Sequence, residues 1–261
     1  MKAPILALDF DETIAARDTT DDIVRLAAAS RPPKEARALL DLWGRSVREY
    51  RHERRRIIQA ALDAVPRGGL LEARVKRFYA ELDAYERSAV DAVEKAGILA
   101  GIRRSALKEA GRRTPTREGA REMAERWRRN GGRAVVVSAN WSEDLAREGS
   151  GIDDVRSNTL EFDRFGVSTG RIHRRVVSAM DKRACVQQMR ASGGRVVYVG
   201  DALNDIPALL EADIGFLIGG KEETRRVWES LAISVQYVER VDPHAPASDR
   251  LYVCLSEHPF E

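Results

Sequence analysis

Residues 5–14, Ile-Leu-Ala-Leu-Asp-Phe-Asp-Glu-Thr-Ile, place a short apolar run directly before two carboxylates. The run Ile5–Leu8 is uniformly apolar, which is typical of a strand that is buried on both faces of a parallel sheet. Asp9 and Asp11 follow at the point where such a strand ends. Because open α/β sheets bind ligands at the carboxyl ends of their strands, this stretch predicts an α/β fold whose functional site begins at Asp9.

Three more apolar runs have the same character, and segments with helical periodicity separate them. Residues 117–129, for example, carry apolar side chains at spacings of three and four. Strands that alternate with helices predict a Rossmann-like core with a mainly parallel sheet. Residues 155–175 indicate a hairpin. The other predicted strands are Ala134–Val137, Val196–Val199, Ile214–Ile218 and a last one at Leu251–Leu255.

The segment from residue 17 to residue 116 has no convincing strand pattern and contains successive amphipathic helices instead. Proline and glycine separate several of them. The sequence therefore predicts a catalytic core made of residues 1–16 and 117–261, interrupted by an all-helical insert at 17–116. The predicted helices of the insert are Thr20–Ala29, Lys34–Leu42, Arg45–Val65, Leu70–Tyr85, Ala89–Lys95 and Ser105–Ala110.

The composition gives no case for a nucleic-acid or membrane partner. The net charge is only +3 over 261 residues, which gives no case for a polyanionic partner. In the basic run 45–56, Glu49 and Glu53 alternate with arginine, so this run predicts an ion-paired, solvated helix face and not an RNA site. Two distant cysteines, Cys185 and Cys254, make no disulfide scaffold. Because the N-terminal apolar run is too short for a signal peptide, we expect a cytoplasmic protein.

Polar groups follow the other predicted strands as well. Ser138 ends the second strand, Asp201 ends the third and precedes Asp205, and Lys182 lies in a helix between them. Several carboxylates at one point repel one another unless a cation binds, and oxygen ligands without histidine or cysteine favour Mg²⁺. Mg²⁺ beside an ammonium and a hydroxyl group suits a phosphoryl group. The sequence contains no P-loop and no dinucleotide-binding fingerprint.

Taken together, these residues resemble the four motifs of the haloacid dehalogenase-like (HAD) superfamily. Residues 9–13 resemble the first motif of the superfamily, D-x-D-x-T. Ser138 resembles the second motif, which is a Ser or Thr directly after an apolar strand. Lys182 resembles its motif lysine, and residues 200–205 its G-D-x-x-x-D motif. The four occur in order, each on its expected element. Glu12 departs from the family pattern, because many members carry glycine there.

The resemblance implies a phosphatase that works through an aspartyl-phosphate intermediate. Asp9 would be the nucleophile, already ionised at neutral pH if its pKa is that of an ordinary aspartate. Asp11 would protonate the leaving oxygen and then act as base on water. That role needs a raised pKa, which we expect from the negative charges of Asp9 and the substrate. The second aspartate also argues against halide chemistry.

The resemblance further implies a Mg²⁺ site and a phosphate site. The Mg²⁺ ligands would be Asp9, the backbone carbonyl of Asp11, and Asp201. Asp205 and Thr13 would support this site. The groups implied for the phosphoryl oxygens are Ser138, Lys182 and the backbone N–H groups of Phe10 and Ala139. Asn140 and Asn204 are interpreted as helix caps.

The insert lies where the superfamily carries a helical cap, which implies a small phosphate monoester as substrate. The chain resembles phosphoserine phosphatases in general. Residues 158–162, 167–172 and 178–182 also resemble thiamin-monophosphate phosphatases, so thiamin monophosphate is a candidate substrate. Two alternatives stay open: a phosphotransferase with the same intermediate, and a non-catalytic protein that binds a phosphorylated metabolite. The oligomeric state is not predicted.

Overall fold

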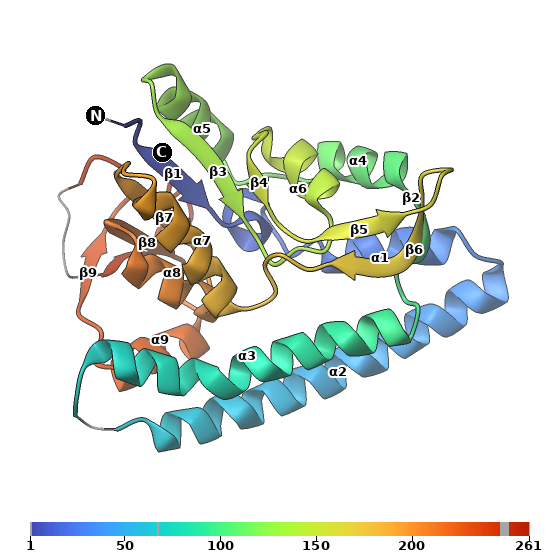
Figure 1. Ribbon diagram of the computed structural model, residues 1–261, viewed down its shortest axis with the longest axis horizontal. Helices are drawn as coiled ribbons and strands as arrows, with labels where there is room; N and C mark the ends of the chain where they lie inside the picture. Colours follow the sequence, from blue (N-terminus) through green and yellow to red (C-terminus); the bar gives the residue numbers. More distant parts are fainter. Residues whose placement is uncertain (1, 67, 246–250, 261) are drawn as a thin grey trace.

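A seven-stranded sheet, in which every pair of neighbouring strands is parallel, lies in the left half of the molecule as drawn in Figure 1. The computed structural model describes residues 2–66, 68–245 and 251–260. The strand order is β4-β3-β1-β7-β8-β10-β9. The bounds are β1 (Ile5–Leu8), β3 (Arg133–Val137), β4 (Val155–Arg156), β7 (Val196–Gly200), β8 (Ile214–Ile218), β9 (Val235–Val238) and β10 (Leu251–Cys254).

Successive residues of each strand point to opposite faces of the sheet, and each face has its own hydrophobic cluster. Leu6 and Leu8 of β1 pack in the cluster that includes α5 (Ala120–Arg129) and α6 (Glu143–Ser150). Ile5 and Ala7 pack in the other cluster, which includes α7 (Ala179–Ala191), α8 (Ile206–Glu211) and α9 (Glu222–Ser230). A sheet covered on both faces explains the uniformly apolar strands, and the predicted α/β fold class is confirmed.

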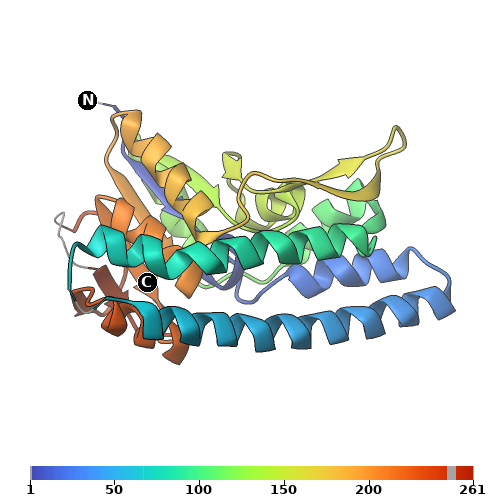
Figure 2. The same ribbon diagram turned by 60° about the horizontal axis from the view of Figure 1, so that its bottom comes forward.

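Between β1 and β3 the chain is mainly helical, with α1 (Thr20–Ala29), α2 (Pro33–Ala64), α3 (Leu71–Lys95) and α4 (Arg104–Arg113). The helices α2 and α3 lie side by side along the length of the molecule (Figure 2). Each of them was predicted as two helices, which is wrong. In α2, a single glycine, Gly44, destabilises the helix by only about 1 kcal/mol and does not end it. In α3, residues 86–88 contain no glycine or proline that would interrupt the helix. Although α2 has 32 residues, neither it nor any other described helix is long and apolar enough to span a bilayer.

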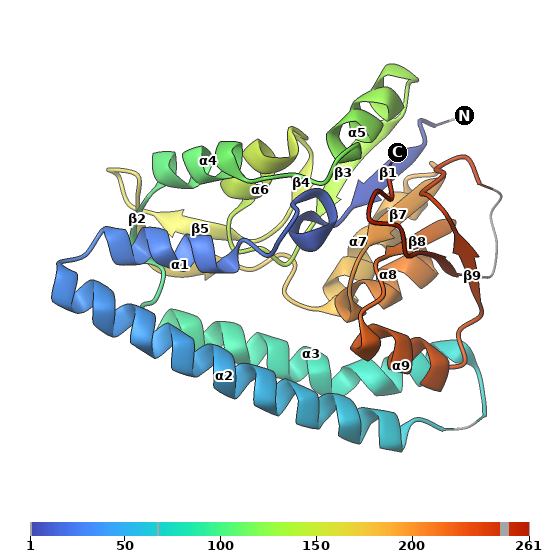
Figure 3. The same ribbon diagram turned by 180° about the vertical axis from the view of Figure 1, so that it is seen from behind.

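A second, antiparallel sheet has the order β2-β6-β5, with bounds β2 (Ala100–Arg103), β5 (Thr159–Phe162) and β6 (Val167–His173). Its β5–β6 part confirms the hairpin predicted in residues 155–175. Strand β2 lies inside the insert and was not predicted, because its partner β6 is distant in the sequence. Figure 3 shows this sheet beside α1 and α4, away from β8 and β9. The proposed division at residues 17 and 116 therefore separates two segments that share a sheet.

Candidate active site

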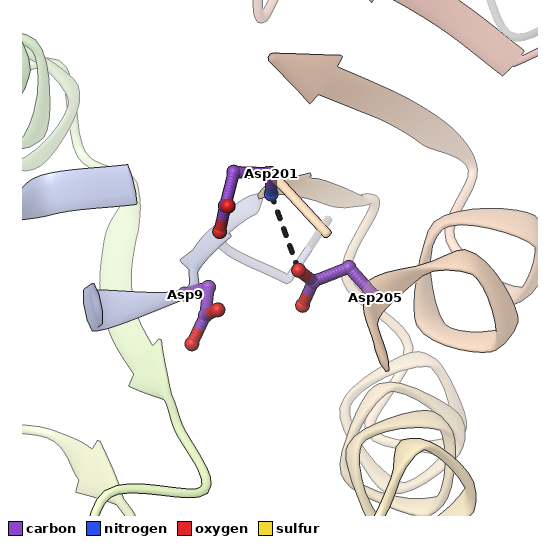
Figure 4. A group of neighbouring side chains, drawn as sticks. All are labelled: Asp9, Asp201 and Asp205. Atoms are coloured by element: carbon purple, nitrogen blue, oxygen red, sulfur yellow. Dashed lines mark hydrogen bonds between the residues drawn. The ribbon is translucent and has the colours of Figure 1, made fainter. Parts of the chain in front are cut away.

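Three buried aspartates meet at the carboxyl ends of the central strands (Figure 4). Asp9 follows β1, Asp201 follows β7, and Asp205 ends the short turn η2 (Leu203–Asp205). One carboxylate oxygen from each lies within 4.8 Å of the others. The register explains this meeting, because Leu8 pairs with Val199 of β7, so that β1 and β7 end at nearly the same level. The convergence predicted from the sequence is present.

Lys182 connects two of these carboxylates. Its ammonium nitrogen lies 2.8 Å from Oδ2 of Asp9 and 2.8 Å from Oδ1 of Asp205. A capping box formed by Ser178 and Asp181 begins helix α7 and places Lys182 in its first turn. Burial alone would lower the pKa of Lys182, but the carboxylates of Asp205 and Asp9 outweigh burial and raise it. Lys182 is therefore a charged, buried ammonium.

Asp205 is held by four hydrogen bonds. Its Oδ1 accepts from Lys182 and from the hydroxyl of Tyr198, at 2.8 Å each, and its Oδ2 accepts from the backbone N–H groups of Asp201 and Ala202, at 3.1 Å each. Gly200 makes this approach possible, because a Cβ at that position would lie 2.3 Å from Cγ of Asp205. Each oxygen of Asp205 accepts two hydrogen bonds, whereas each oxygen of Asp9 and Asp201 has one partner. Asp205 is therefore placed to support its neighbours and has less capacity left to coordinate a metal.

Asp9 does not titrate like an ordinary aspartate. Its Oδ1 accepts a hydrogen bond of 2.8 Å from the N–H of Phe10. Burial raises the pKa of Asp9 well above its usual range, and the charges of Asp205 and Asp201 add to that rise against the opposing effect of Lys182. The expectation of an ordinary pKa is therefore wrong for the chain without a bound cation, because the sequence does not reveal how deeply Asp9 is buried.

Asp11 lies beside Asp9 with a separate set of partners. Its Oδ1 accepts from the N–H and the hydroxyl of Thr19, at 2.8 and 2.6 Å, and its Oδ2 accepts from Nδ2 of Asn140 at 2.9 Å. Burial of the carboxyl group, followed by the charge of Asp18, raises the pKa of Asp11 to about 6. The expected direction of the shift is present, but its cause is burial and Asp18, and not Asp9.

Asn140 has two functions in this network. Its Oδ1 accepts from the N–H of Ser142, and its Nδ2 donates to Asp11. The prediction that Asn140 caps a helix is wrong, because Ser142 is the N-cap of α6. Ser138 and the half-buried Ala139 precede it at the end of β3. The buried hydroxyl oxygen of Ser138 accepts a hydrogen bond of 3.1 Å from the N–H of Asn140. The end of β3 thus reaches the same edge of the sheet as Asp9 and Asp11.

Two charged residues that the sequence analysis did not assign also reach the cluster. The ammonium of Lys221 lies 2.6 Å from Oδ2 of Asp201 and 2.6 Å from Oε2 of Glu12. Thr13, which was predicted to support the metal site, donates a hydrogen bond of 3.2 Å to Oδ1 of Asp201. Lys221 follows β8 and belongs to none of the four motifs. The one signal in the sequence was Glu12, the residue at which residues 9–13 depart from the family pattern.

The helices of the insert contact the segments that carry these groups. Arg54 of α2 forms an ion pair of 2.6 Å with Glu223 of α9 and donates to Oδ1 of Asn204 at 3.3 Å. The buried Tyr79 of α3 donates to the carbonyl oxygen of Leu203 at 2.7 Å. Asn204 was predicted to cap a helix; instead its side chain accepts from Arg54. The insert therefore lies directly over η2, next to Asp205.

A cavity of about 890 Å³ lies away from the carboxylates, between the start of α3 and helices α7 and α8. Arg183 lines it and is already paired with Glu72 at 2.7 Å and Glu211 at 2.9 Å. Its charged groups pair with one another and do not converge on an open point. The carboxylate cluster is therefore the stronger candidate for the active site.

A model of the haloacid dehalogenase-like hydrolase family matches residues 6–210, well over half of the chain. The chain belongs to the haloacid dehalogenase-like hydrolases. The resemblance inferred from the four motifs is confirmed at the level of the family, and with it the expectation of a hydrolase.

Two curated relatives match this HAD-like hydrolase over part of their own length. The bifunctional TH2 protein of Arabidopsis thaliana, named as mitochondrial, is 25% identical over 88% of this chain and 42% of its own length. The phosphoserine phosphatase of Archaeoglobus fulgidus is 31% identical over 51% of this chain and 40% of its own length. The chain thus spans about two fifths of the length of both relatives.

Solved structures share the HAD fold with this chain. A phospho-aspartyl intermediate analogue of phosphoserine phosphatase has a TM-score of 0.53 and 20% identity, and the match covers 86% of this chain and 90% of that one. A probable phosphoserine phosphatase from Vibrio cholerae has a TM-score of 0.55 and 18% identity, over 88% of this chain and 59% of that one. At these identities the likeness concerns the fold.

Proposed function

We propose that this HAD-like hydrolase is a Mg²⁺-dependent phosphatase that cleaves a small phosphate monoester through an aspartyl-phosphate on Asp9. One observation carries the proposal: Asp9, Asp201 and the charged Lys182 meet in one buried cluster at the ends of the central strands. Such a set can attack phosphorus and offset the charge of the phosphoryl oxygens. Relatives named phosphoserine phosphatase support the reaction class.

The charges of the cluster fit a divalent cation. When all four are ionised, the carboxylates of Asp9, Asp201, Asp205 and Glu12 carry two more charges than the ammonium groups of the two lysines between them, which leaves an excess of two negative charges. Oxygen donors without histidine or cysteine suit Mg²⁺. Because Asp205 is already held by four hydrogen bonds, the proposed ligands are Asp9, Asp201 and the backbone carbonyl of Asp11. A bound Mg²⁺ would supply positive charge next to the phosphoryl oxygens.

In the first step, a carboxylate oxygen of Asp9 attacks phosphorus and the ester P–O bond breaks. The leaving oxygen takes the proton of Asp11, whose raised pKa of about 6 lets a useful fraction stay protonated near neutral pH. In the second step, the Asp11 carboxylate takes a proton from water while that water attacks phosphorus. Phosphate leaves, Asp9 is regenerated, and Asp11 again carries its proton. Ser138, Lys182 and the N–H of Ala139 are the proposed partners of the phosphoryl oxygens.

The position of the insert supports the proposal that the substrate is small. Helices α2 and α3 lie over the segment next to Asp205 and contact it through Arg54 and Tyr79. Phosphoserine is one candidate, from the names of relatives. Thiamin monophosphate is a second candidate, from the resemblance of residues 158–182. A cytoplasmic location is also part of this proposal.

The test is phosphate release from a panel of small phosphomonoesters that includes phosphoserine and thiamin monophosphate, with Mg²⁺ and with chelator. We expect release that requires Mg²⁺, with one ester preferred. Substrate loss that exceeds phosphate release in the presence of an added alcohol would indicate phosphotransfer. Binding of an ester with no turnover by folded protein and Mg²⁺ would indicate a binding protein instead.

Replacing Asp11 by asparagine should separate the two chemical steps. We expect turnover of an alkyl phosphate to fall by roughly 10²–10⁴-fold, the usual contribution of general acid–base catalysis. With p-nitrophenyl phosphate the first step needs no acid, so we expect a rapid burst of about one p-nitrophenol per chain, followed by slow turnover. Stopped-flow absorbance measures the burst. Equal losses with both esters and no burst would contradict the role of Asp11.

Mg²⁺ should stabilise the protein more at pH 7 than at pH 5. Burial, with Asp205, raises the pKa of Asp201 to about 6, and the pKa of Asp9 is raised as well. The protonated forms therefore stabilise the metal-free fold below about pH 4, and this contribution is lost as pH rises through about 6. At pH 7 and 100 times Kd, Mg²⁺ should contribute about 2.7 kcal/mol, or roughly 5–10 °C in Tm.

Scanning calorimetry at both pH values measures this difference. Asp201→Asn is the matched variant, and it should lose most of the shift at pH 7. The same Mg²⁺ shift at pH 5 and pH 7, or an unchanged shift in Asp201→Asn, would contradict a cation site at these carboxylates.

A further inference from the structure

Glu12 has a backbone conformation that favours glycine. Its φ is 57° and its ψ is 3°, in the left-handed region, which is strained for a residue with a side chain. Its carboxylate reaches across to Lys221, with 2.6 Å between Oε2 and Nζ. The chain thus carries a charged side chain at a position where glycine would relieve strain, and that side chain holds a lysine next to the carboxylate cluster.

Lys221 reaches Asp201 from the solvent side. Its side chain is 43% exposed, whereas that of Asp201 is 5% exposed. The ammonium lies 2.6 Å from Oδ2 of Asp201, and Thr13 donates to Oδ1 of the same carboxylate at 3.2 Å. Both oxygens of Asp201 are therefore engaged. A cation that coordinates Oδ2 must share it with the ammonium at close range or displace the ammonium, and a cation that coordinates Oδ1 has the ammonium on the other oxygen of the same carboxylate.

We propose that Lys221 is a built-in competitor for the cation at Asp201, and that Glu12, which already contacts Lys221 in this structure, is the partner that retains Lys221 once the cation binds. The inference rests on the proposed function, because it requires Mg²⁺ at Asp201. Two positive groups beside one carboxylate repel each other, and the repulsion weakens as the ammonium turns from Asp201 toward Glu12. The pair Glu12–Lys221 would thereby set the Mg²⁺ concentration at which the site fills.

Isothermal titration of the full chain with MgCl₂, without substrate, tests this directly. Lys221→Met should tighten Mg²⁺ binding about tenfold, the order expected when one positive charge a few ångströms from a divalent ion is removed in a solvated site. Lys76→Met is the matched control. It removes an ammonium from the exposed pair with Glu72 on α3, and it should leave the Mg²⁺ affinity unchanged within about twofold. Lys221→Gln replaces the methionine variant if that variant does not fold.

Glu12→Gly should have the opposite effect. Without its alternative partner, Lys221 stays on Asp201, so Mg²⁺ binding should weaken about threefold or more. Most of this effect should vanish in the Lys221→Met background, because no competing ammonium is left. Thermal unfolding in chelator should show no loss of stability in Glu12→Gly, since glycine suits the left-handed backbone.

Two results would overturn the inference. Weaker Mg²⁺ binding in Lys221→Met would mean that Lys221 orients Asp201 as a ligand. Unchanged binding would mean that the ion pair lies outside the cation's position. If the unmodified chain binds Mg²⁺ and hydrolyses an ester, either result rejects the competition between Lys221 and Mg²⁺ but does not contradict the proposed phosphatase function. Absence of Mg²⁺ binding and of hydrolysis in the unmodified chain rejects both.

Discussion

Asp9→Asn is expected to lower phosphate release by roughly 10⁴-fold or more, because a neutral amide cannot form the acyl phosphate and loss of a nucleophile typically has effects of this size. The substitution keeps the shape of the side chain and an oxygen that can accept from the N–H of Phe10, a contact of 2.8 Å in the structure. The amide nitrogen replaces the oxygen that accepts from Lys182, but Lys182 keeps Asp205 as a partner at 2.8 Å, so we expect a folded variant with some loss of stability. Phosphate release with the preferred ester and Mg²⁺, together with circular dichroism, measures both effects.

The matched control is Asp41→Asn, which removes an exposed carboxylate from helix α2 and should leave activity unchanged. Mass spectrometry after acid quench should find phosphate on the peptide that contains Asp9 in the unmodified chain and not in Asp9→Asn. Retention of more than about a hundredth of the activity in Asp9→Asn would contradict a nucleophile at this position.

Lys182→Met should be the most destabilising substitution at the site. Lys182 is 3% exposed and holds Asp9 and Asp205 at 2.8 Å each. Removing one partner of a buried ion pair leaves uncompensated charge, which typically lowers the free energy of unfolding by about 3–5 kcal/mol. For a chain of this length we expect Tm to fall by roughly 6–20 °C. Urea unfolding and calorimetry without Mg²⁺ measure the loss.

A second substitution distinguishes charge from packing at Lys182. The double variant Lys182→Met with Asp205→Asn should recover part of the lost stability, because one uncompensated carboxylate is removed, but it should not recover activity. Lys34→Met, at an exposed position near the start of α2, controls for net charge and should stay within about 0.5 kcal/mol of the unmodified chain. A loss below about 1 kcal/mol in Lys182→Met would mean that the buried carboxylates are neutral in the metal-free fold.

The central sheet could be predicted from local sequence because its signal is local. Ile5–Leu8 is buried on both faces, and the polar residues after each strand mark the edge where Asp9, Ser138 and Asp201 gather. Strand β2 had no such signal. It has four residues, only one of them fully buried, and it becomes a strand by pairing with β6 more than sixty residues later. Pairing between distant segments is not encoded in the periodicity of either one.

At the candidate site, too, contacts between residues that are distant in the sequence could not be predicted. The motif spacing indicated Asp9, Lys182 and Asp205, but not Lys221, whose contact with Asp201 depends on how the loop after β8 turns toward β7. Nor did it indicate the cause of the raised pKa of Asp11, which depends on burial and on Asp18. Residue types and their order were predictable, whereas their depth and their partners follow from tertiary packing.

Tyr79 joins helix α3 of the insert to η2, next to Asp205. Its ring is fully buried in the hydrophobic cluster that also contains Leu203, and its hydroxyl donates to that residue's carbonyl. Lifting α3 away from η2 would expose this ring, at about 1.5–3 kcal/mol for a large apolar side chain, and would break the hydrogen bond as well. The lifted state is thus rarely populated at equilibrium. If a bound product leaves only when α3 lifts, its release would be governed by a tyrosine that takes no part in the chemistry.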